Sequence, residues 1–148
     1  MKKYCSIVTF LVIIMSLLSN CRKEPLNIIL YDKSPSTIEK YIQGKWRLVY
    51  AKGGICSICT FPCNDCYVQF TSDNRINSTG FYTTSDTTSI HWIKDKGLYL
   101  MGDSTYLLSF TDSKGGPWLL VVDQIYYDTL ILYDNAYDRM FYYHVRIK

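Results

Sequence analysis

Three observations predict an all-β fold, in which about eight antiparallel strands form an up-and-down barrel preceded by a short helix. The chain has 148 residues, of which 14 are tyrosine, and threonine, isoleucine and valine are also frequent, as pleated sheets favour. Turn-forming clusters recur at short intervals after Gly44, a spacing typical of sandwiches and barrels. No helical pattern follows Gly44 that would connect parallel strands, which argues against an α/β enzyme fold.

The N-terminus has the pattern of an export signal. Two lysines at positions 2 and 3 precede an apolar run over 7–18, which has the size of a signal-peptide core and is short for a bilayer span. The run ends in Leu-Ser-Asn-Cys at Cys21, which resembles the lipobox of bacterial lipoproteins. The resemblance implies cleavage before Cys21, a diacylglyceryl group on its thiol and an acylated amino terminus. We therefore expect residues 1–20 to be a lipoprotein signal peptide; the alternatives are an ordinary cleaved signal and an uncleaved anchor helix.

Lipid on Cys21 would place the protein in the cell envelope, with the bilayer as its partner. Several acyl chains on one residue anchor a protein stably, and we expect an outer-membrane lipoprotein. Arg22, Lys23 and Glu24 resemble the surface-export signal of Bacteroidota lipoproteins, although only one acid is present. Removing residues 1–20 takes away two lysines and no acid, so the formal net charge falls from +3 to +1. No stripe of basic residues remains, so nucleic acid is not an expected partner.

The mature chain is expected to have two parts, a lipidated tether over 21–35 and a barrel domain over 36–148. Within the tether, 28–30 is apolar enough to dock on the barrel. The domain opens with a predicted helix over 36–43, because Ser36 and Glu39 form a capping box and Gly44 suits the position after the last turn.

Eight strands are predicted between the turn signals that follow. They are 45–52, 67–72, 75–83, 88–94, 97–101 with 104–111, 118–125, 127–133 and 139–147. Such a barrel either is filled by side chains or holds one small ligand. Aromatic residues fall on both faces of 139–147, so one face is expected to pack inside. The other face is then unusually apolar or contacts the helix or the tether.

A family resemblance appears at Gly44-Lys45-Trp46, which resembles the Gly-x-Trp motif at the first strand of lipocalins. In that superfamily the tryptophan packs at the closed end of the barrel beneath an arginine of the last strand, and Arg146 stands in the matching place. The segments GKWRLVYAKGG, YVQFTSDNRI and YYDTLILYDNAYDRMFYYHVRIK resemble small lipocalin-like lipoproteins of Bacteroidota, over about residues 36–148. The Thr-Asp-Tyr motif of typical lipocalins is missing. A tryptophan–guanidinium contact is worth about 0.5–2 kcal/mol, so Gly44, Trp46 and Arg146 are predicted to be structural.

Four cysteines, Cys56, Cys59, Cys63 and Cys66, have the spacing C-x2-C-x3-C-x2-C. Three of them match the letters of a radical-SAM cluster motif, but an exported, short, β-rich chain does not suit that chemistry, and the ferredoxin spacing differs. A zinc site stays an alternative, although zinc knuckles are usually about 15–20 residues apart. A redox C-x-x-C needs a helix that is not predicted here. Disulfides are favoured in an exported chain.

The pairing of these cysteines is open among three arrangements. The nested pairing, 56–66 with 59–63, shares one midpoint at Phe61 and is favoured over the neighbour pairing, 56–59 with 63–66. In lipocalin-like barrels the connection between the first two strands crosses the open mouth. We therefore expect the cysteines to staple a lid loop with Phe61 and Pro62 at its tip.

No catalytic constellation is visible. His91 and His144 are isolated and are expected to be half-buried strand residues, and most carboxylates fall in turns. We therefore expect no enzyme, cofactor or metal. The resemblance implies a membrane-anchored barrel that binds a small apolar or amphipathic ligand, whose binding residues the sequence does not identify. The alternative is a filled barrel that acts as a structural or interaction module of the envelope.

Overall fold

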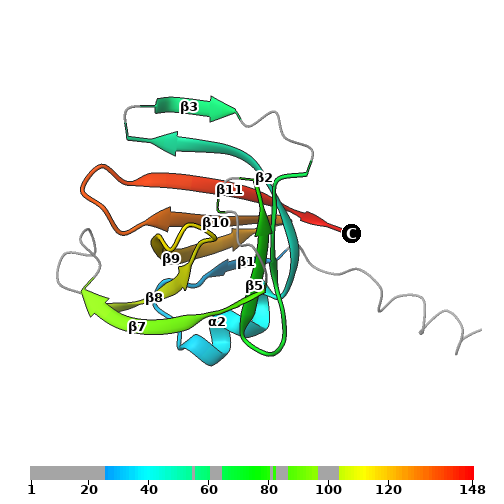
Figure 1. The fold of residues 1–148 in the computed structure, drawn as a ribbon, viewed down its shortest axis with the longest axis vertical. Helices are drawn as coiled ribbons and strands as arrows, with labels where there is room; N and C mark the ends of the chain where they lie inside the picture. The colour runs from blue at the N-terminus through cyan, green and yellow to red at the C-terminus, as the bar shows by residue number, and fades with distance from the viewer. Residues whose placement is uncertain (1–25, 55, 61–64, 81, 83–86, 97–103) are drawn as a thin grey trace, which may run out of the picture.

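The computed structural model describes residues 26–54, 56–60, 65–80, 82, 87–96 and 104–148. In this part of the chain one antiparallel sheet curls into a nearly closed barrel with one short helix (Figure 1). The elements are β1 (Asn27–Ile29), α2 (Pro35–Ile42), β2 (Gly44–Gly53), β3 (Cys56–Thr60), β4 (Tyr67–Phe70), β5 (Arg75–Thr79), β6 (Thr88–Ser89), β7 (His91–Lys96), β8 (Ser104–Thr111), β9 (Pro117–Tyr126), β10 (Thr129–Asp134) and β11 (Met140–Ile147). The predicted all-β barrel is therefore confirmed.

The strands form an up-and-down meander in which the first long strand pairs with the last. Their order is β6-β5-β4-β2-β11-β10-β9-β8-β7. Only Ile90 separates β6, which pairs with β5, from β7, which pairs with β8. Likewise, β3 and β4 follow one another along the same edge of β2. The described sheet therefore has eleven strands, more than the eight that the sequence predicts, because β1 and β3 were not expected and the predicted strand 88–94 is divided at Ile90.

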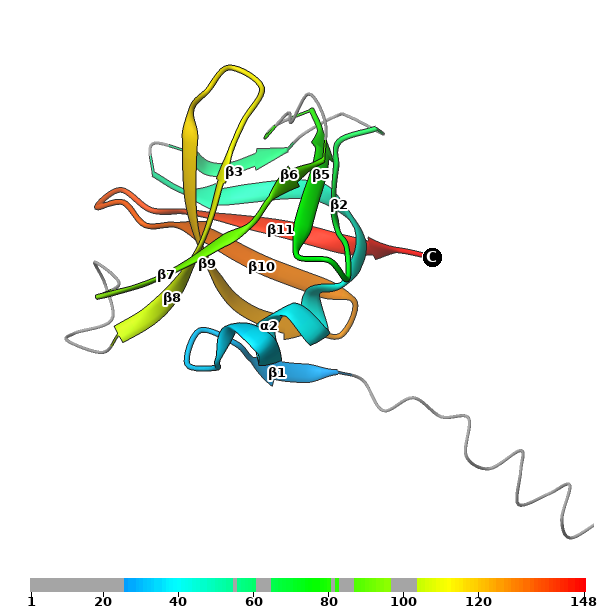
Figure 2. The ribbon, with the colours of Figure 1, turned by 60° about the horizontal axis from the view of Figure 1, so that its bottom comes forward.

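The helix α2 closes one end of the barrel (Figure 2). It begins at Pro35, one residue before the predicted start, and its N-cap residue Ser34 makes no side-chain capping hydrogen bond. The predicted capping box of Ser36 and Glu39 is therefore wrong. Proline suits the first helical position because its missing N–H is not needed there. Glu39 instead accepts a hydrogen bond of 2.6 Å from Trp92 Nε1 on β7, which ties the helix to the barrel wall.

The predicted tether is partly a strand. Residues 27–29 pair as β1 with β9, Leu30 is fully buried, and the amides of Leu30 and Tyr31 both donate to the Asp123 carbonyl. The barrel body thus begins before residue 36, where the sequence placed its boundary. The apolar run over 28–30 docks because β8 pairs only with the first half of β9, so the second half offers a free edge to β1.

The two faces of β11 have different partners. Tyr142 and His144 are buried and point inward. On the outer face Tyr143 stacks on Tyr50 with ring centroids 4.3 Å apart. Phe141 packs with Tyr31 against a small outer cluster of Leu107, Val121 and Tyr133. The outer face of β11 and Tyr31 of the predicted tether thus share one small apolar cluster.

Candidate functional site in the barrel interior

The closed end of the barrel is built around Trp46 and Arg146. The guanidinium carbon of Arg146 lies 4.0 Å from the centroid of the Trp46 ring, so the predicted contact is present. Arg146 Nη1 donates to the Gln43 carbonyl at 3.0 Å and Nη2 to the Tyr41 carbonyl at 3.3 Å. These carbonyls lie at the C-terminus of α2, where helices leave backbone acceptors unsatisfied. Arg146 therefore joins the last strand to the helix that closes the barrel.

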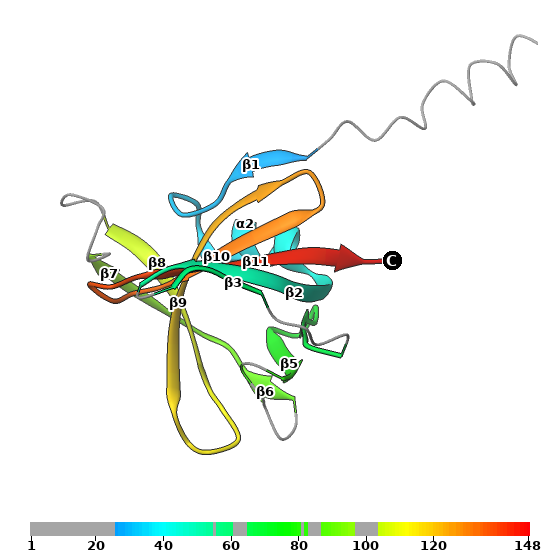
Figure 3. The same ribbon diagram turned by 90° about the horizontal axis from the view of Figure 1, so that it is seen from above.

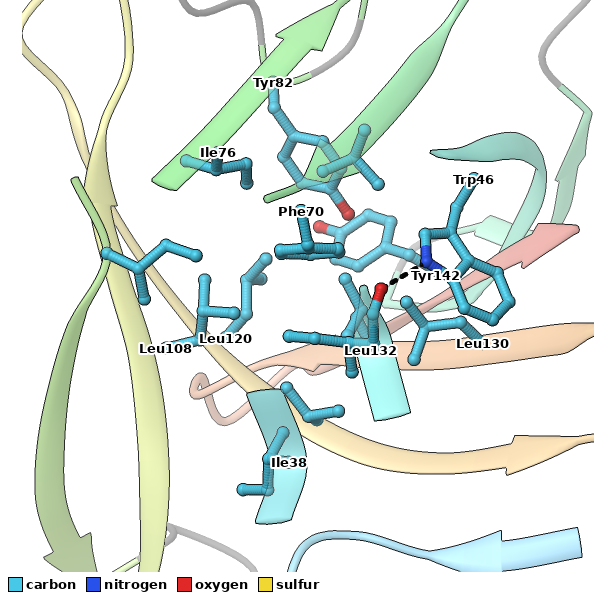
Figure 4. Close-up of a cluster of buried hydrophobic side chains, with 14 of the residues drawn as sticks. Ile38, Trp46, Phe70, Ile76, Tyr82, Leu108, Leu120, Leu130, Leu132 and Tyr142 are labelled. Carbon is cyan, nitrogen blue, oxygen red and sulfur yellow. Dashed lines mark hydrogen bonds between the residues drawn. The ribbon is translucent and has the colours of Figure 1, made fainter. Parts of the chain in front are cut away.

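The same contacts explain Gly44 and the indole nitrogen of Trp46. Gly44 has φ of +115°, and a Cβ atom there would lie 3.1 Å from Arg146 Nη1. Trp46 is fully buried, and its Nε1 donates to the Ile42 carbonyl at 2.6 Å (Figure 4). The predicted contact of the Gly-x-Trp segment with Arg146 is thus present, and the same segment is tied to the end of α2.

Aromatic side chains surround Tyr82 inside the barrel (Figure 4). Its ring meets those of Trp118, Tyr142 and Phe110 edge to face, with centroid distances of 5.1, 5.7 and 6.0 Å. The ring also stacks on His144 at 5.9 Å. These five residues form what we call the Tyr82 cage. Burial raises the pKa values of Tyr82 and Tyr142, so both phenols stay neutral and keep their O–H groups.

His144 is the cage residue that brings a ring nitrogen into the barrel interior. It is fully buried between Leu48 and Leu130 on the neighbouring strands. Its Nδ1 lies 3.2 Å from the Tyr142 carbonyl, which only accepts, so Nδ1 carries the proton. Nε2 is buried and has no hydrogen-bond partner within the described residues. Burial lowers the pKa of His144 to about 4, so at neutral pH Nε2 presents a lone pair.

The sequence expectation for the two histidines is wrong in both directions. His144 is fully buried and His91 is exposed on β7, whereas both were expected to be half-buried. One sequence signal places His144 inside, because it alternates with Arg146, whose predicted contact with Trp46 marks the inward face. No local signal marks Tyr82, which was expected inside a strand over 75–83 and lies beyond the end of β5 at Thr79.

The cysteine segment is partly strand rather than loop. Cys56 and Cys59 lie on β3, opposite Gly53 and Ala51 of β2. Cys66 is buried, its carbonyl accepts from the Leu48 amide, and a Cβ atom at Gly80 would collide with it. The predicted lid tip, with Phe61, Pro62 and Cys63, lies outside the described residues. Among described residues, no three His, Cys, Asp or Glu side chains gather as metal ligands.

The strand register argues against the favoured nested pairing. Cys56 and Cys66 face β2 at Gly53 and Leu48, which are roughly 16 Å apart along a strand that rises about 3.3 Å per residue. A disulfide needs Cα atoms about 4.4–6.8 Å apart. Cys59 and Cys66, about 10 Å apart by the same measure, are also too distant. The irregular pairing of β3 places Cys56 and Cys59 opposite residues about 6.6 Å apart. Cys63 lies outside the described residues, so the neighbour pairing is the arrangement that the register does not argue against.

Comparisons with known proteins leave the family open. No protein-family model matches the chain, and neither curated proteins nor solved structures give a match. In the part of the chain that the structure describes, no helix is both long and apolar enough to span a membrane.

Proposed function

We propose that the protein is a non-enzymatic lipoprotein, anchored in the outer membrane through lipid on Cys21, whose lipocalin-like barrel binds one small amphipathic molecule. The signal pattern before Cys21 supports the anchor. The unpaired Nε2 of His144 inside the Tyr82 cage is the observation that carries the binding proposal.

The cost of that unpaired nitrogen is the reason to assign it a ligand. A buried polar group without a partner costs about 1–3 kcal/mol, and such groups in native structures call for an explanation. A ligand that donates an O–H or N–H to Nε2 would remove this cost. Because the walls of the cage are aromatic, the body of the ligand should be flat and apolar, with few polar groups fixing its orientation.

Tyr82 is the side chain that a ligand would replace. Its ring fills the centre of the cage, yet its backbone lies outside every described strand. The other cage residues are all on strands, with Phe110 on β8, Trp118 on β9 and Tyr142 and His144 on β11. Moving the backbone at Tyr82 would therefore disturb no strand pairing among the described residues, whereas moving it at any of the others would.

A second candidate is a filled barrel that serves as a structural or interaction module of the envelope. The continuous cluster of large buried side chains in the interior favours it. In this case Tyr82 is a permanent part of the core, and His144 keeps its uncompensated nitrogen.

Probe binding separates the two candidates. The probe is N-phenyl-1-naphthylamine, which has a flat apolar body and one N–H, added to residues 22–148, which lack the apolar signal run and the lipid-bearing Cys21, so that no detergent is needed. We expect a one-to-one complex in native mass spectrometry and a rise in probe fluorescence. His144→Phe should weaken binding at least tenfold, Tyr82→Ala should strengthen it, and His91→Phe, at an exposed position, should change nothing.

Two results would overturn the binding proposal. If neither the wild-type barrel nor Tyr82→Ala takes up the probe, the filled module is the better account. If binding survives His144→Phe unchanged, the probe occupies another place and His144 is not the recognition group.

We also infer that the cysteines form two disulfides, 56–59 and 63–66. The strand register supports this inference, because it keeps Cys66 far from both Cys56 and Cys59. An exported protein meets the oxidising conditions in which such bonds persist. These bridges close short loops, so their effect is on local shape near the mouth rather than on global stability.

A further inference from the structure

One end of the barrel carries four exposed apolar or aromatic side chains. They are Leu26, Tyr126, Tyr127 and Ile147, which are 36, 49, 54 and 39% exposed, and together they are called the anchor-end patch here. The Tyr127 amide donates to the Leu26 carbonyl at 2.7 Å, and the rings of Tyr126 and Tyr127 meet at 4.5 Å. The patch is therefore assembled from the first described residue, the β9–β10 turn and the end of the last strand.

The backbone geometry of the turn holds both tyrosines outward. Tyr127 has φ of +55°, an uncommon conformation for a residue other than glycine. The Asp128 carbonyl accepts from the Arg146 amide at 2.8 Å, so the turn is fixed to β11 as well as to Leu26. Figure 3 shows the start of β1, the β9–β10 turn and the C-terminus on one side of the molecule.

The chain length before Leu26 limits how far this end can be from a bilayer. Only four residues separate Cys21 from Leu26, and the five residue steps between them span at most about 17 Å when extended. The eight residues of β11 cover roughly 25 Å from one end of the barrel to the other. A tether shorter than the barrel strand keeps the anchor-end patch nearer to the lipid than the opposite end.

We propose that the anchor-end patch rests in the headgroup region of the membrane that holds Cys21. Tyrosine is enriched at membrane interfaces because its ring is apolar and its hydroxyl group stays in water. Asp128 and Lys148, which are exposed beside the patch, have opposite signs, so we test a zwitterionic lipid surface. This inference rests on the proposed lipid anchor.

A photoreactive residue at two matched positions tests the contact. p-Benzoylphenylalanine replaces Tyr127 in one variant and Tyr137 in another. Tyr137 is 83% exposed and lies between β10 and β11, at the opposite end of the barrel. Both lipidated full-length proteins are placed in vesicles of fluorescent phosphatidylcholine and irradiated. We expect lipid adducts at position 127 at least tenfold more often than at 137.

The readouts separate the docking from the anchor. Vesicle flotation and the mass of the N-terminal peptide report lipid on Cys21 independently of the cross-link. A protein that floats with a diacylglyceryl mass but labels equally at both positions, or more at 137, overturns the docking alone. A chain that carries no lipid and does not float overturns the anchor, and the orientation falls with it.

Discussion

At the scale of single residues, His144 makes the stability of the folded protein depend on pH. Its pKa is lowered to about 4 in the folded protein, against an ordinary value of about 6.5. Between about pH 4 and 6.5 the unfolded chain binds a proton at His144 that the folded protein does not bind. The free energy of unfolding is therefore highest above about pH 6.5 and falls as the pH is lowered toward 4. The shift corresponds to about 3 kcal/mol.

We therefore expect His144→Phe to flatten part of this pH dependence. Urea denaturation at intervals from pH 4.5 to 7.5 measures the free energy of unfolding of the wild type, His144→Phe and the exposed control His91→Phe. The wild type and the control should lose up to about 3 kcal/mol more than His144→Phe as the pH falls. Parallel curves for all three proteins would show that His144 does not titrate as described.

Residue-level prediction from the sequence succeeded where a partner was known in advance. Trp46 and Arg146 come from a motif that names both, and their contact is present at 4.0 Å. Tyr82 was not found, because its position depends on where the chain returns over the barrel after β5. That path is set by packing against Trp118 and Phe110, which no local pattern encodes.

At the scale of elements, the sequence predicted the long strands well and the short ones poorly. The hydrophobic run over 28–30 was visible, but its partner, the free half-edge of β9, exists only after the barrel has formed. Similarly, β3 was expected to be loop because its cysteines dominate the segment. It forms a strand because it pairs with the second half of β2, beyond the residues that pair with β4. Edges of a sheet attract any segment that is able to pair with them.

The pairing of cysteines is the testable consequence at this scale. Digestion without reduction, after blocking of free thiols, followed by mass spectrometry should yield the linkages 56–59 and 63–66. A peptide linking Cys56 to Cys66 would show that β3 is not in the register described. Four blocked thiols, or zinc retained after purification, would instead remove the disulfides altogether.

At the scale of the whole molecule, the sequence predicted the architecture but left the contents of the barrel undetermined. Alternating apolar residues specify strands and an inside, because one face of each strand must be buried. They do not distinguish a packed interior from one that receives a ligand. That distinction depends on a few groups, here Tyr82 and His144, whose surroundings come from strands far apart in the chain.

Lipidation is the prediction that concerns the whole protein. Cells grown with an alkyne fatty-acid analogue should label the wild-type chain and leave Cys21→Ala unlabelled, and the variant should move out of the membrane fraction. The four other mature cysteines lie beyond residue 55, so a label that persists on Cys21→Ala would place the acyl group elsewhere and contradict the signal-peptide assignment.

The helix that closes the barrel also determines which end of the barrel would face the membrane. Gly44 follows α2 and pairs at the start of β2, beside the end of β11 that carries Ile147. With lipid on Cys21, the sealed end would be the one held close to the membrane, and the Trp118 end of the cage would be the distal one. A molecule arriving at Tyr82 would come from the aqueous side rather than up through the lipid. If Cys21 carries lipid and the barrel binds a ligand, we therefore expect that ligand to be taken from water and not drawn out of the membrane.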